Sequence, residues 1–211
     1  MYYRSFASMN IAIIGNGRIN ESLAIGLAAS GHHVWVGSTK DAMAYNNFLY
    51  NFYDIQHVSI EEAATACDII FIATEEDEVR EVAYRIDDVK QKVVIDCTSF
   101  CEPTGPNSNT LSAIKAITGS QRIVKCYRCN GCDTFSSRLL KKDAMDIFLA
   151  GDDVRSKQIA KVMFDNLGFK ECFDFGGEDM VPKLDAMTAS WHNLGLDKIP
   201  GTDIQLALIR K

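Results

Sequence analysis

The sequence predicts an α/β fold with a doubly wound, mostly parallel sheet, and three observations support this prediction. Apolar runs of strand length alternate with helical patterns along the chain of 211 residues. One run, 68–73 (DIIFIA), is almost continuously apolar, as is typical of a strand that is covered on both faces. A glycine-containing turn, 15–20, joins the first apolar run to the first helical pattern. Strands and helices that alternate in this way form parallel sheets covered by helices.

The first predicted elements form a strand–helix–strand unit. Residues 10–14 (NIAII) are an apolar strand, and after the turn a helical run leads to a second strand that ends at 37–40. This order places the free N–H groups and the dipole of a helix N-terminus where they can hold a pyrophosphate. We therefore expect a dinucleotide-binding unit at the start of the chain.

The rest of the chain continues the alternation. Val79, Ala83 and Ile86 share one face of a helix expected at 78–86, and 97–109 is a polar loop that contains two prolines. The other strands that we expect are 58–60, 68–73, 93–96, 122–127, 146–150 and 173–175, and the other helices are 61–66, 111–117, 154–167 and 180–194.

Length and composition fit one domain. With 47% hydrophobic and 24% charged residues, the chain can build a single α/β core. We expect one Rossmann-type domain, 1–211, in which 9–150 is the nucleotide-binding core. Residues 151–211 would complete it with a strand and a short C-terminal helical extension.

The glycine turn contains the residues expected to bind the pyrophosphate. Gly15 makes the turn, Gly17 lets a phosphate approach the backbone, and Arg18 could add positive charge. The third glycine of the usual fingerprint is Asn20 here, so the fingerprint is imperfect. The alternatives are an ordinary turn and, for Arg18, a solvated surface cation.

The end of the second strand indicates which nucleotide binds. An NAD site usually has an acidic residue at this point for the ribose 2′-hydroxyl, whereas this chain has Ser38, Thr39 and Lys40. Two hydroxyls and an ammonium group suit a 2′-phosphate better. We therefore favour NADP(H) over NAD, with a surface cation as the alternative for Lys40.

The carboxyl ends of the other strands supply the remaining candidate residues. Ligands of doubly wound sheets bind beyond these ends, near the point where the strand order switches. Besides the glycine turn and 38–40, this rule selects 73–74, 97–99 and 127–128. Ordinary loop chemistry is the alternative for each.

The net charge and the lack of targeting signals limit the partners and the location that we expect. A formal net charge of −6 without a basic stripe argues against nucleic acid. No apolar run reaches membrane-spanning length, and residues 1–8 lack the apolar core of a secretory signal. We expect a cytoplasmic protein.

The seven cysteines are expected to be reduced thiols, because their number is odd and no export signal precedes them. Cys126, Cys129 and Cys132 have the spacing CxxCxxC, and Cys97 or Cys101 could be a fourth ligand of zinc or an iron–sulfur cluster. However, Cys126 lies within an apolar strand, which is a poor place for a metal ligand. We therefore expect no metal and regard the cysteines as incidental, although the spacing also suits a redox-active thiol pair.

Taken together, the glycine turn, the strand ending VWVGS, the strand at 67–73, the Lys125-containing strand and the segment LAGDD resemble the coenzyme F(420)-dependent NADP reductase family. This family includes the cytosolic domain of six-transmembrane ferric reductases. The resemblance implies a homodimer in which 16–19 bind pyrophosphate and 38–40 bind the 2′-phosphate. It also implies a nicotinamide flanked by the residues Ala73, Thr74, Cys126 and Tyr127, and Cys97 lies at the same rim.

Departures from the family leave the second substrate open. Where relatives carry Pro, Asn-Pro and Lys-Ala-Phe-Asn-Thr segments, this chain has 74–76, 99–100 and 125–129. Glu75, Glu76 and Asp77 would also repel an anionic deazaflavin.

These features predict hydride transfer between NADPH and a flavin-like, deazaflavin-like or other small redox acceptor. The residues show no acid–base constellation, and His32, His33, His57 and His192 are expected to be structural or solvent-facing, so we name no catalytic residue. Related reductases append a helical substrate domain, and we expect none here because only about 35 residues follow the last predicted strand. The alternative is an NADP(H)-binding sensor or interaction module without turnover.

Overall fold

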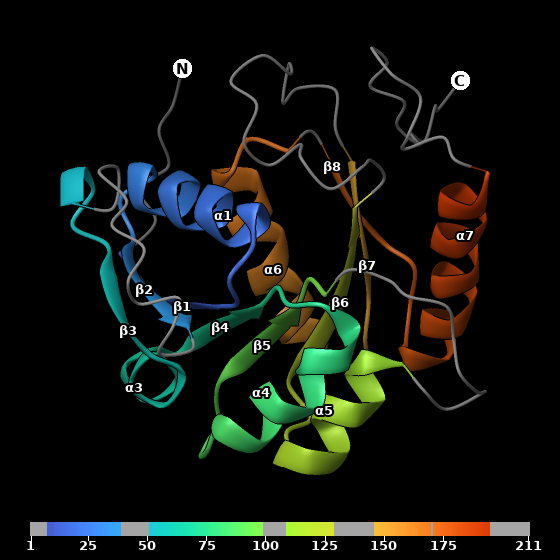
Figure 1. Ribbon diagram of the computed structural model, residues 1–211. Helices are drawn as coiled ribbons and strands as arrows, with labels where there is room; N and C mark the ends of the chain where they lie inside the picture. The colour runs from blue at the N-terminus through green and yellow to red at the C-terminus, as the bar shows by residue number, and fades with distance from the viewer. Residues whose placement is uncertain (1–7, 39–50, 99–108, 129–145, 170, 195–211) are drawn as a thin grey trace.

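The computed structural model describes residues 8–38, 51–98, 109–128, 146–169 and 171–194. These residues form an eight-stranded sheet with the order β3-β2-β1-β4-β5-β6-β7-β8, covered by helices on both faces (Figure 1). All neighbouring strands are parallel except β6 and β7, which are antiparallel. The doubly wound, mostly parallel sheet predicted from the sequence is confirmed. The strands are β1 Asn10–Ile14, β2 His33–Ser38, β3 Gln56–Ser59, β4 Ile69–Ile72, β5 Val93–Asp96, β6 Ile123–Arg128, β7 Asp146–Ala150 and β8 Glu171–Asp174.

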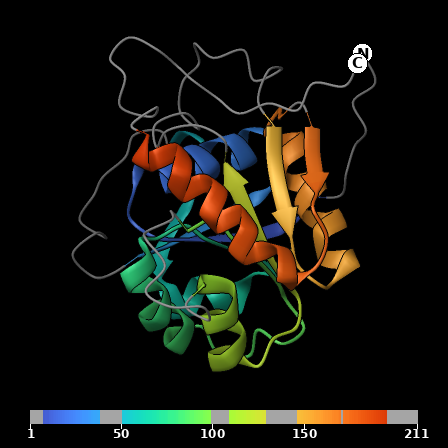
Figure 2. The same ribbon diagram turned by 90° about the vertical axis from the view of Figure 1, so that its right-hand side faces the viewer.

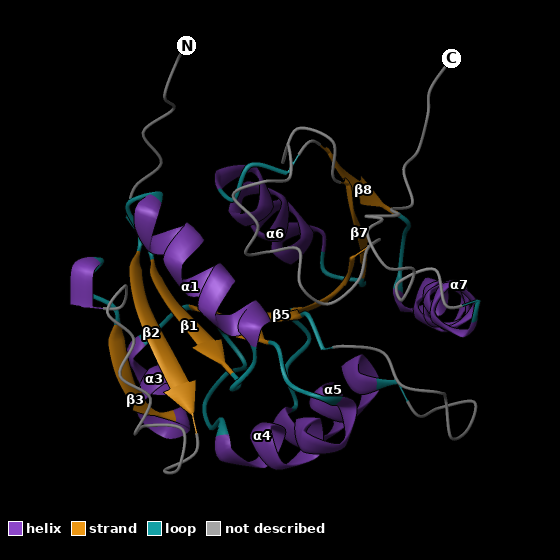
Figure 3. Cartoon of the chain, turned by 45° about the horizontal axis from the view of Figure 1, so that its top comes forward, coloured by secondary structure: helices purple, strands orange, loops and turns teal. Residues whose placement is uncertain are grey.

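Helices cover the two faces in two separate hydrophobic layers (Figure 3). One layer lies under α1 and α6, and the other lies under α3, α4, α5 and the first turns of α7. The helices are α1 Arg18–Ala29, α3 Ile60–Ala66, α4 Val79–Arg85, α5 Thr110–Thr118, α6 Val154–Asn166 and α7 Val181–Asn193, with short 3-10 helices η2 Glu76–Glu78 and η4 Glu178–Met180.

The alternation of side chains along the strands assigns residues to these layers. In β4 all four residues are buried, because Phe71 points to the α1 and α6 layer while Ile70 and Ile72 point to the other. Phe71 meets Phe164 of α6 edge to face, with ring centroids 6.1 Å apart. A run that is apolar at every position therefore becomes a central strand.

Several predicted boundaries shift by one or two residues; the strand expected at 173–175, for example, is observed at Glu171–Asp174. The strand expected at 58–60 extends instead over Gln56–Ser59, and Ile60 is the first residue of α3. Ser59 caps this helix: its Oγ accepts the Glu62 N–H at 3.2 Å, and its own N–H donates to Glu62 Oε2 at 3.0 Å. This capping box starts the helix although Ile60 is β-branched.

The strand order has a switch point, and the carboxyl ends of the strands on either side of it lie together. The strand order reverses between β1 and β4, and β1 to β6 all run in the same direction, so their carboxyl ends share an edge. α7 crosses the sheet in front of β6 near this edge (Figure 2). This edge is where a doubly wound sheet binds its ligand.

None of the described helices combines the length and the apolar character that crossing a membrane requires.

Candidate nucleotide-binding site

The turn between β1 and α1 requires glycine at position 15. Gly15 has φ +139, and a Cβ placed there would lie 2.4 Å from the backbone oxygen of Ala73 and 2.4 Å from Asn20 Nδ2. Its N–H donates to the Gly37 carbonyl at 3.2 Å, which ties the turn to β2. Any side chain at this position would force β1 and β4 apart.

Gly17 has a different role from Gly15. Its φ of −93 and ψ of 175 suit any residue, and an added Cβ would meet Asn20 Oδ1 at a relaxed 3.6 Å. The fold therefore tolerates a side chain here. A glycine that the backbone does not need leaves space for the close approach of a ligand.

Asn20, at the position of the usual third glycine, is part of the turn. It is 2% exposed, and its Oδ1 accepts the Gly17 N–H at 3.1 Å. Its Nδ2 is buried and has no hydrogen-bond partner among the described residues. Because the Gly17 amide is engaged, the amides of Asn16, Arg18 and Ile19 are the donors that this turn can offer to an anion.

A cavity joins the glycine turn to the ends of β2 and β4. Gly15, Asn16, Ser38 and Thr74, all selected from the sequence, line this cavity. Thr39 and Lys40 lie outside the described residues. The full lining consists of Ile14, Gly15, Asn16, Ser38, Ile60, Thr74, Glu78, Glu81 and Val82. Glu78 and Glu81 were not predicted from the sequence, because only the packing of α4 against the edge brings them to this cavity.

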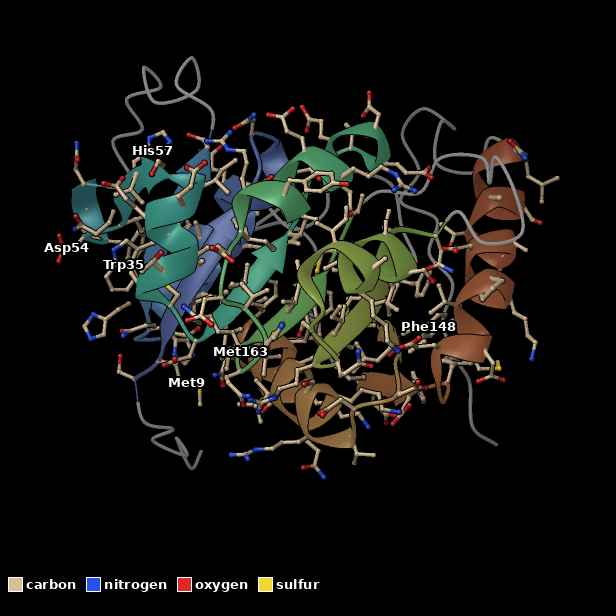
Figure 4. The ribbon with its side chains drawn as sticks, turned by 90° about the horizontal axis from the view of Figure 1, so that it is seen from below. Met9, Trp35, Asp54, His57, Phe148 and Met163 are labelled. Atoms are coloured by element: carbon tan, nitrogen blue, oxygen red, sulfur yellow. The ribbon has the colours of Figure 1, made fainter. Side chains whose placement is uncertain are left out.

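Ser38 at the cavity wall is paired with a histidine. Its Oγ lies 2.6 Å from His57 Nε2, and the side chain of His57 is partly buried. Burial lowers the pKa of His57. The sequence predicted a structural or solvent-facing role for this histidine. It lies on β3, and Figure 4 shows it on the other side of the molecule from Met9, which precedes β1. No local pattern reveals its contact with Ser38, since the contact depends on the pairing of β2 with β3.

A buried ionic network braces the neighbouring strand ends. Lys125 Nζ of β6 lies 3.1 Å from Asp96 Oδ2 at the end of β5, and it donates to Thr110 Oγ1 at 2.8 Å and to the Thr98 carbonyl at 3.2 Å. Asp96 Oδ1 accepts the Thr98 N–H at 3.0 Å. All three donor positions of the ammonium group are used, so Lys125 fixes the start of the loop after β5.

Two threonine hydroxyls at this edge remain unused. Thr74 Oγ1 and Thr98 Oγ1 are buried and have no hydrogen-bond partner among the described residues. They follow β4 and β5, beside the cavity and beside the Lys125 network respectively. A buried hydroxyl without a hydrogen-bond partner lowers the stability of the folded protein. Such hydroxyls are expected in a free protein whose site binds a polar ligand.

Tyr127 and Asp185 form a second polar contact, between β6 and α7. Tyr127 Oη lies 2.9 Å from Asp185 Oδ1 and 3.1 Å from the Val181 carbonyl oxygen, and both side chains are buried. Burial raises the pKa of Asp185; Lys125 and the Tyr127 hydrogen bond act in the opposite direction, and the charges of Asp96 and Glu76 raise it. The Tyr127 hydroxyl is the donor in both contacts, and its single proton can serve only one of the two oxygens at a time.

The described cysteines are Cys67, Cys97, Cys126 and Cys172, and all are free thiols. Cys126 points away from Tyr127, into the layer under α1 and α6, next to Cys97 and Cys172. Burial and the neighbouring Cys97 thiol raise the pKa of Cys126. Cys101, Cys129 and Cys132 lie outside the described residues, and within the described part no group of three His, Cys, Asp or Glu side chains could hold a metal ion.

The candidate residues therefore fall into three places along one edge. Gly15, Asn16, Ser38 and Thr74 share the cavity, Cys97 and Cys126 meet beneath the ends of β5 and β6, and Tyr127 faces α7. Ile19, in the first turn of α1, packs against the hydrophobic layer under α1 and α6, and the Ala73 carbonyl faces Gly15. The side chain of Arg18 lies outside the described atoms.

The fold and the glycine turn at its switch point define a Rossmann-type, dinucleotide-binding α/β protein. Comparison with protein families gives a closer assignment: residues 10–99 match the family described as NADP oxidoreductase, coenzyme F(420)-dependent. The match runs from β1 to the residues after β5, and it confirms the resemblance found in the sequence. The match indicates an NAD(P)-dependent oxidoreductase.

Solved structures share the fold at low identity. A candidate F(420)-dependent NADP reductase from Arthrobacter sp. FB24 aligns with a TM-score of 0.71 and 17% identity, over 89% of this chain and 94% of that chain. A pyrroline-5-carboxylate reductase from Coxiella burnetii aligns with a TM-score of 0.64 and 17% identity, over 89% of this chain and 67% of its own. An imine reductase from Pseudomonas sp. aligns with a TM-score of 0.68 and 13% identity, over 90% of this chain and 64% of its own. No curated protein sequence matches this chain significantly.

Proposed function

We propose that the protein is an NADP(H)-dependent oxidoreductase that transfers a hydride between NADP(H) and a small flavin-like, deazaflavin-like or other redox acceptor. The observation that carries this proposal is the cavity that joins the glycine turn to Ser38 and Thr74 at the switch point. The family match over residues 10–99 supports a nicotinamide nucleotide as the ligand.

The residues of the glycine turn fit a pyrophosphate. Gly17 leaves the space beside the turn free of a side chain, and α1 begins directly after it, so the first amides of this helix are available to an anion. In the proposed complex the amides of Asn16, Arg18 and Ile19 bind the pyrophosphate oxygens, with Arg18 as a further source of positive charge. Ser38, together with Thr39 and Lys40, binds the 2′-phosphate.

The ends of β4, β5 and β6 would orient the nicotinamide. Thr74 and Thr98 offer buried, unused hydroxyls on this side, and they suit the amide group of a nicotinamide. Ala73, Cys97, Cys126 and Tyr127 complete the proposed flanking set, Cys126 through its backbone because its side chain points into the layer under α1 and α6. When bound, the nicotinamide supplies or accepts the hydride, and the role of the chain is to orient the two reactants and exclude water.

Acidic residues at this edge limit the choice of acceptor. Glu75 and Asp77 are exposed, and Glu76 lies close enough to Asp185 to raise its pKa. Their combined charge opposes an anionic acceptor such as a phosphorylated deazaflavin. We propose an acceptor of little negative charge, in a homodimer whose partner subunit helps to cover the acceptor side.

The proposal is tested by following NADPH oxidation at 340 nm with a panel of flavins, deazaflavins, quinones and ferric chelates. We expect turnover with at least one acceptor and weaker activity with NADH. NADPH binding without turnover across the panel would instead support a sensor or interaction module. If neither nucleotide binds, the proposed function is wrong.

A further inference from the structure

The contact between Ser38 and His57 lies where the proposed nucleotide would place its adenosine ribose. Ser38 is the last residue of β2 and is 3% exposed, and it lines the cavity with Gly15 and Asn16. In the β2–β3 pairing, His57 stands opposite Val36, and its ring reaches forward so that Nε2 lies 2.6 Å from Ser38 Oγ. This distance is that of a short hydrogen bond whose direction depends on which atom carries the proton.

The direction of this hydrogen bond decides what Ser38 can offer to a ligand. If His57 Nε2 is the acceptor, the single hydroxyl proton of Ser38 points at the ring, and only oxygen lone pairs face the cavity. If Nε2 carries a proton and donates it, the Ser38 proton is free to point into the cavity. A phosphate oxygen accepts hydrogen bonds, so only the second arrangement lets Ser38 bind a 2′-phosphate.

A ribose 2′-hydroxyl responds differently from a phosphate. This hydroxyl can donate as well as accept, so it can bond with Ser38 in either arrangement. The direction of the Ser38–His57 hydrogen bond therefore affects NADPH and leaves NADH almost unaffected. Glu78 and Glu81 on another wall of the same cavity add negative charge, so the donors for a phosphate belong on the Ser38 side.

We infer that His57 is a specificity-determining positioning residue for NADP(H): its Nε2–H donates to Ser38 Oγ, so that the Ser38 hydroxyl donates to the 2′-phosphate. This inference rests on the proposed function. Because burial lowers the pKa of His57, the ring is neutral near pH 7 and acts as the tautomer that carries the proton on Nε2. Its contribution is orientation of Ser38 rather than charge.

The test measures dissociation constants of NADPH and NADH for single and double variants of the full chain. His57→Phe removes the donor, His57→Gln keeps an N–H donor, and His33→Phe is the matched control on an exposed histidine at the opposite end of β2. We expect His57→Phe to weaken NADPH by roughly threefold to tenfold, the net value of the neutral hydrogen bond that holds the Ser38 hydroxyl in its donating orientation. NADH should change less than about twofold, and His57→Gln should retain most of the NADPH affinity.

A double-mutant cycle with Ser38→Ala shows whether His57 acts through Ser38. We expect Ser38→Ala to weaken NADPH more than His57→Phe does, because it removes the donating hydroxyl itself, and we expect the double variant to lose no more than Ser38→Ala alone. Independent, additive losses, or a Ser38→Ala variant with unchanged NADPH preference, would overturn the inference. If His57→Phe does not fold, His57→Leu removes the same donor and takes its place in the cycle.

The outcome also separates this inference from the proposed function. A wild-type protein that prefers NADPH, together with a His57→Phe variant that keeps the same preference, would overturn the role of His57 alone. A wild-type protein that binds neither nucleotide would overturn the proposed function itself.

Discussion

Two glycines of the same turn, Gly15 and Gly17, differ in what they require of the backbone. Gly15 has a backbone conformation and a close neighbour, the Ala73 carbonyl, that leave no room for a side chain. Gly17 has neither constraint. The sequence predicted that both residues belong to the turn, but it could not show that Asn20 engages the Gly17 amide, because this contact depends on the orientation of one side chain.

The two glycines predict a contrast between stability and binding. Gly15→Ala should lower the free energy of unfolding by roughly 2–4 kcal/mol, because it adds backbone strain and a clash with a carbonyl. Gly17→Ala should change it by less than about 1 kcal/mol and should instead weaken NADPH. Urea denaturation and nucleotide titration of both variants check this, and equal losses of stability would contradict the different roles of the two glycines.

Asp185 predicts a pH dependence of stability. Burial raises the pKa of its carboxyl in the folded state, so the folded protein binds this proton more tightly than the unfolded chain does. The stability that this proton contributes is therefore fully present at low pH. It is lost as the pH rises from the pKa of the unfolded chain, about 3.9, through the higher pKa of the folded protein. Asp185→Asn removes the titration and keeps a side-chain oxygen that can accept the Tyr127 hydroxyl proton.

The Asp185→Asn variant should therefore gain on the wild type as pH rises, by about 1.4 kcal/mol for each pKa unit of the shift. Denaturation midpoints measured from pH 4 to pH 8 check this. Asp179→Asn, at an exposed side chain of η4, is the control and should run parallel to the wild type. A parallel curve for Asp185→Asn would show that Asp185 is ionised in the folded protein.

Among the secondary-structure elements, β5, β6 and α5 are joined by the Lys125 network. Lys125 and Asp96 have side chains that are 4% and 0% exposed, and Thr110 at the start of α5 bonds to both. A buried pair of this kind gives little net stability over apolar residues, but loss of one partner leaves an unpaired buried charge. The network therefore holds the loop after β5 in one position.

Lys125→Met should lower the free energy of unfolding by about 3–5 kcal/mol, because Asp96 is left buried without its partner. Lys183→Met, at an exposed pair 4.0 Å from Asp179, should cost less than about 1 kcal/mol. Chemical denaturation of both variants checks the difference. A small effect of Lys125→Met would mean that water or another cation reaches Asp96.

The elements themselves were largely predictable from the sequence. Apolar periodicity placed the strands and helices of the described regions within a few residues, and the shifted boundary at Ile60 follows from the cap at Ser59. The site was less predictable. Ser38 with His57, Lys125 with Asp96, and Tyr127 with Asp185 join residues that are distant in sequence, so strand pairing and helix docking alone reveal them.

Across the molecule, the two halves of the sheet differ in their likeness to known proteins: one half matches a family in sequence, and the other matches only in fold. The family match ends at residue 99, while the fold likeness to the Arthrobacter protein covers 89% of the chain. The nucleotide half therefore keeps a family sequence pattern. The half with β6, β7, β8 and α7 lies outside the family match and shares only the fold with the Arthrobacter protein.

Equilibrium titration of the wild-type protein with NADPH and with NADH would decide whether the cavity at the switch point is an NADP(H) site. We expect both nucleotides to bind and NADPH to bind at least about tenfold more tightly, since the 2′-phosphate gains at least one charge-assisted hydrogen bond at the end of β2. Equal affinities, tighter binding of NADH, or no binding of either nucleotide would contradict this assignment.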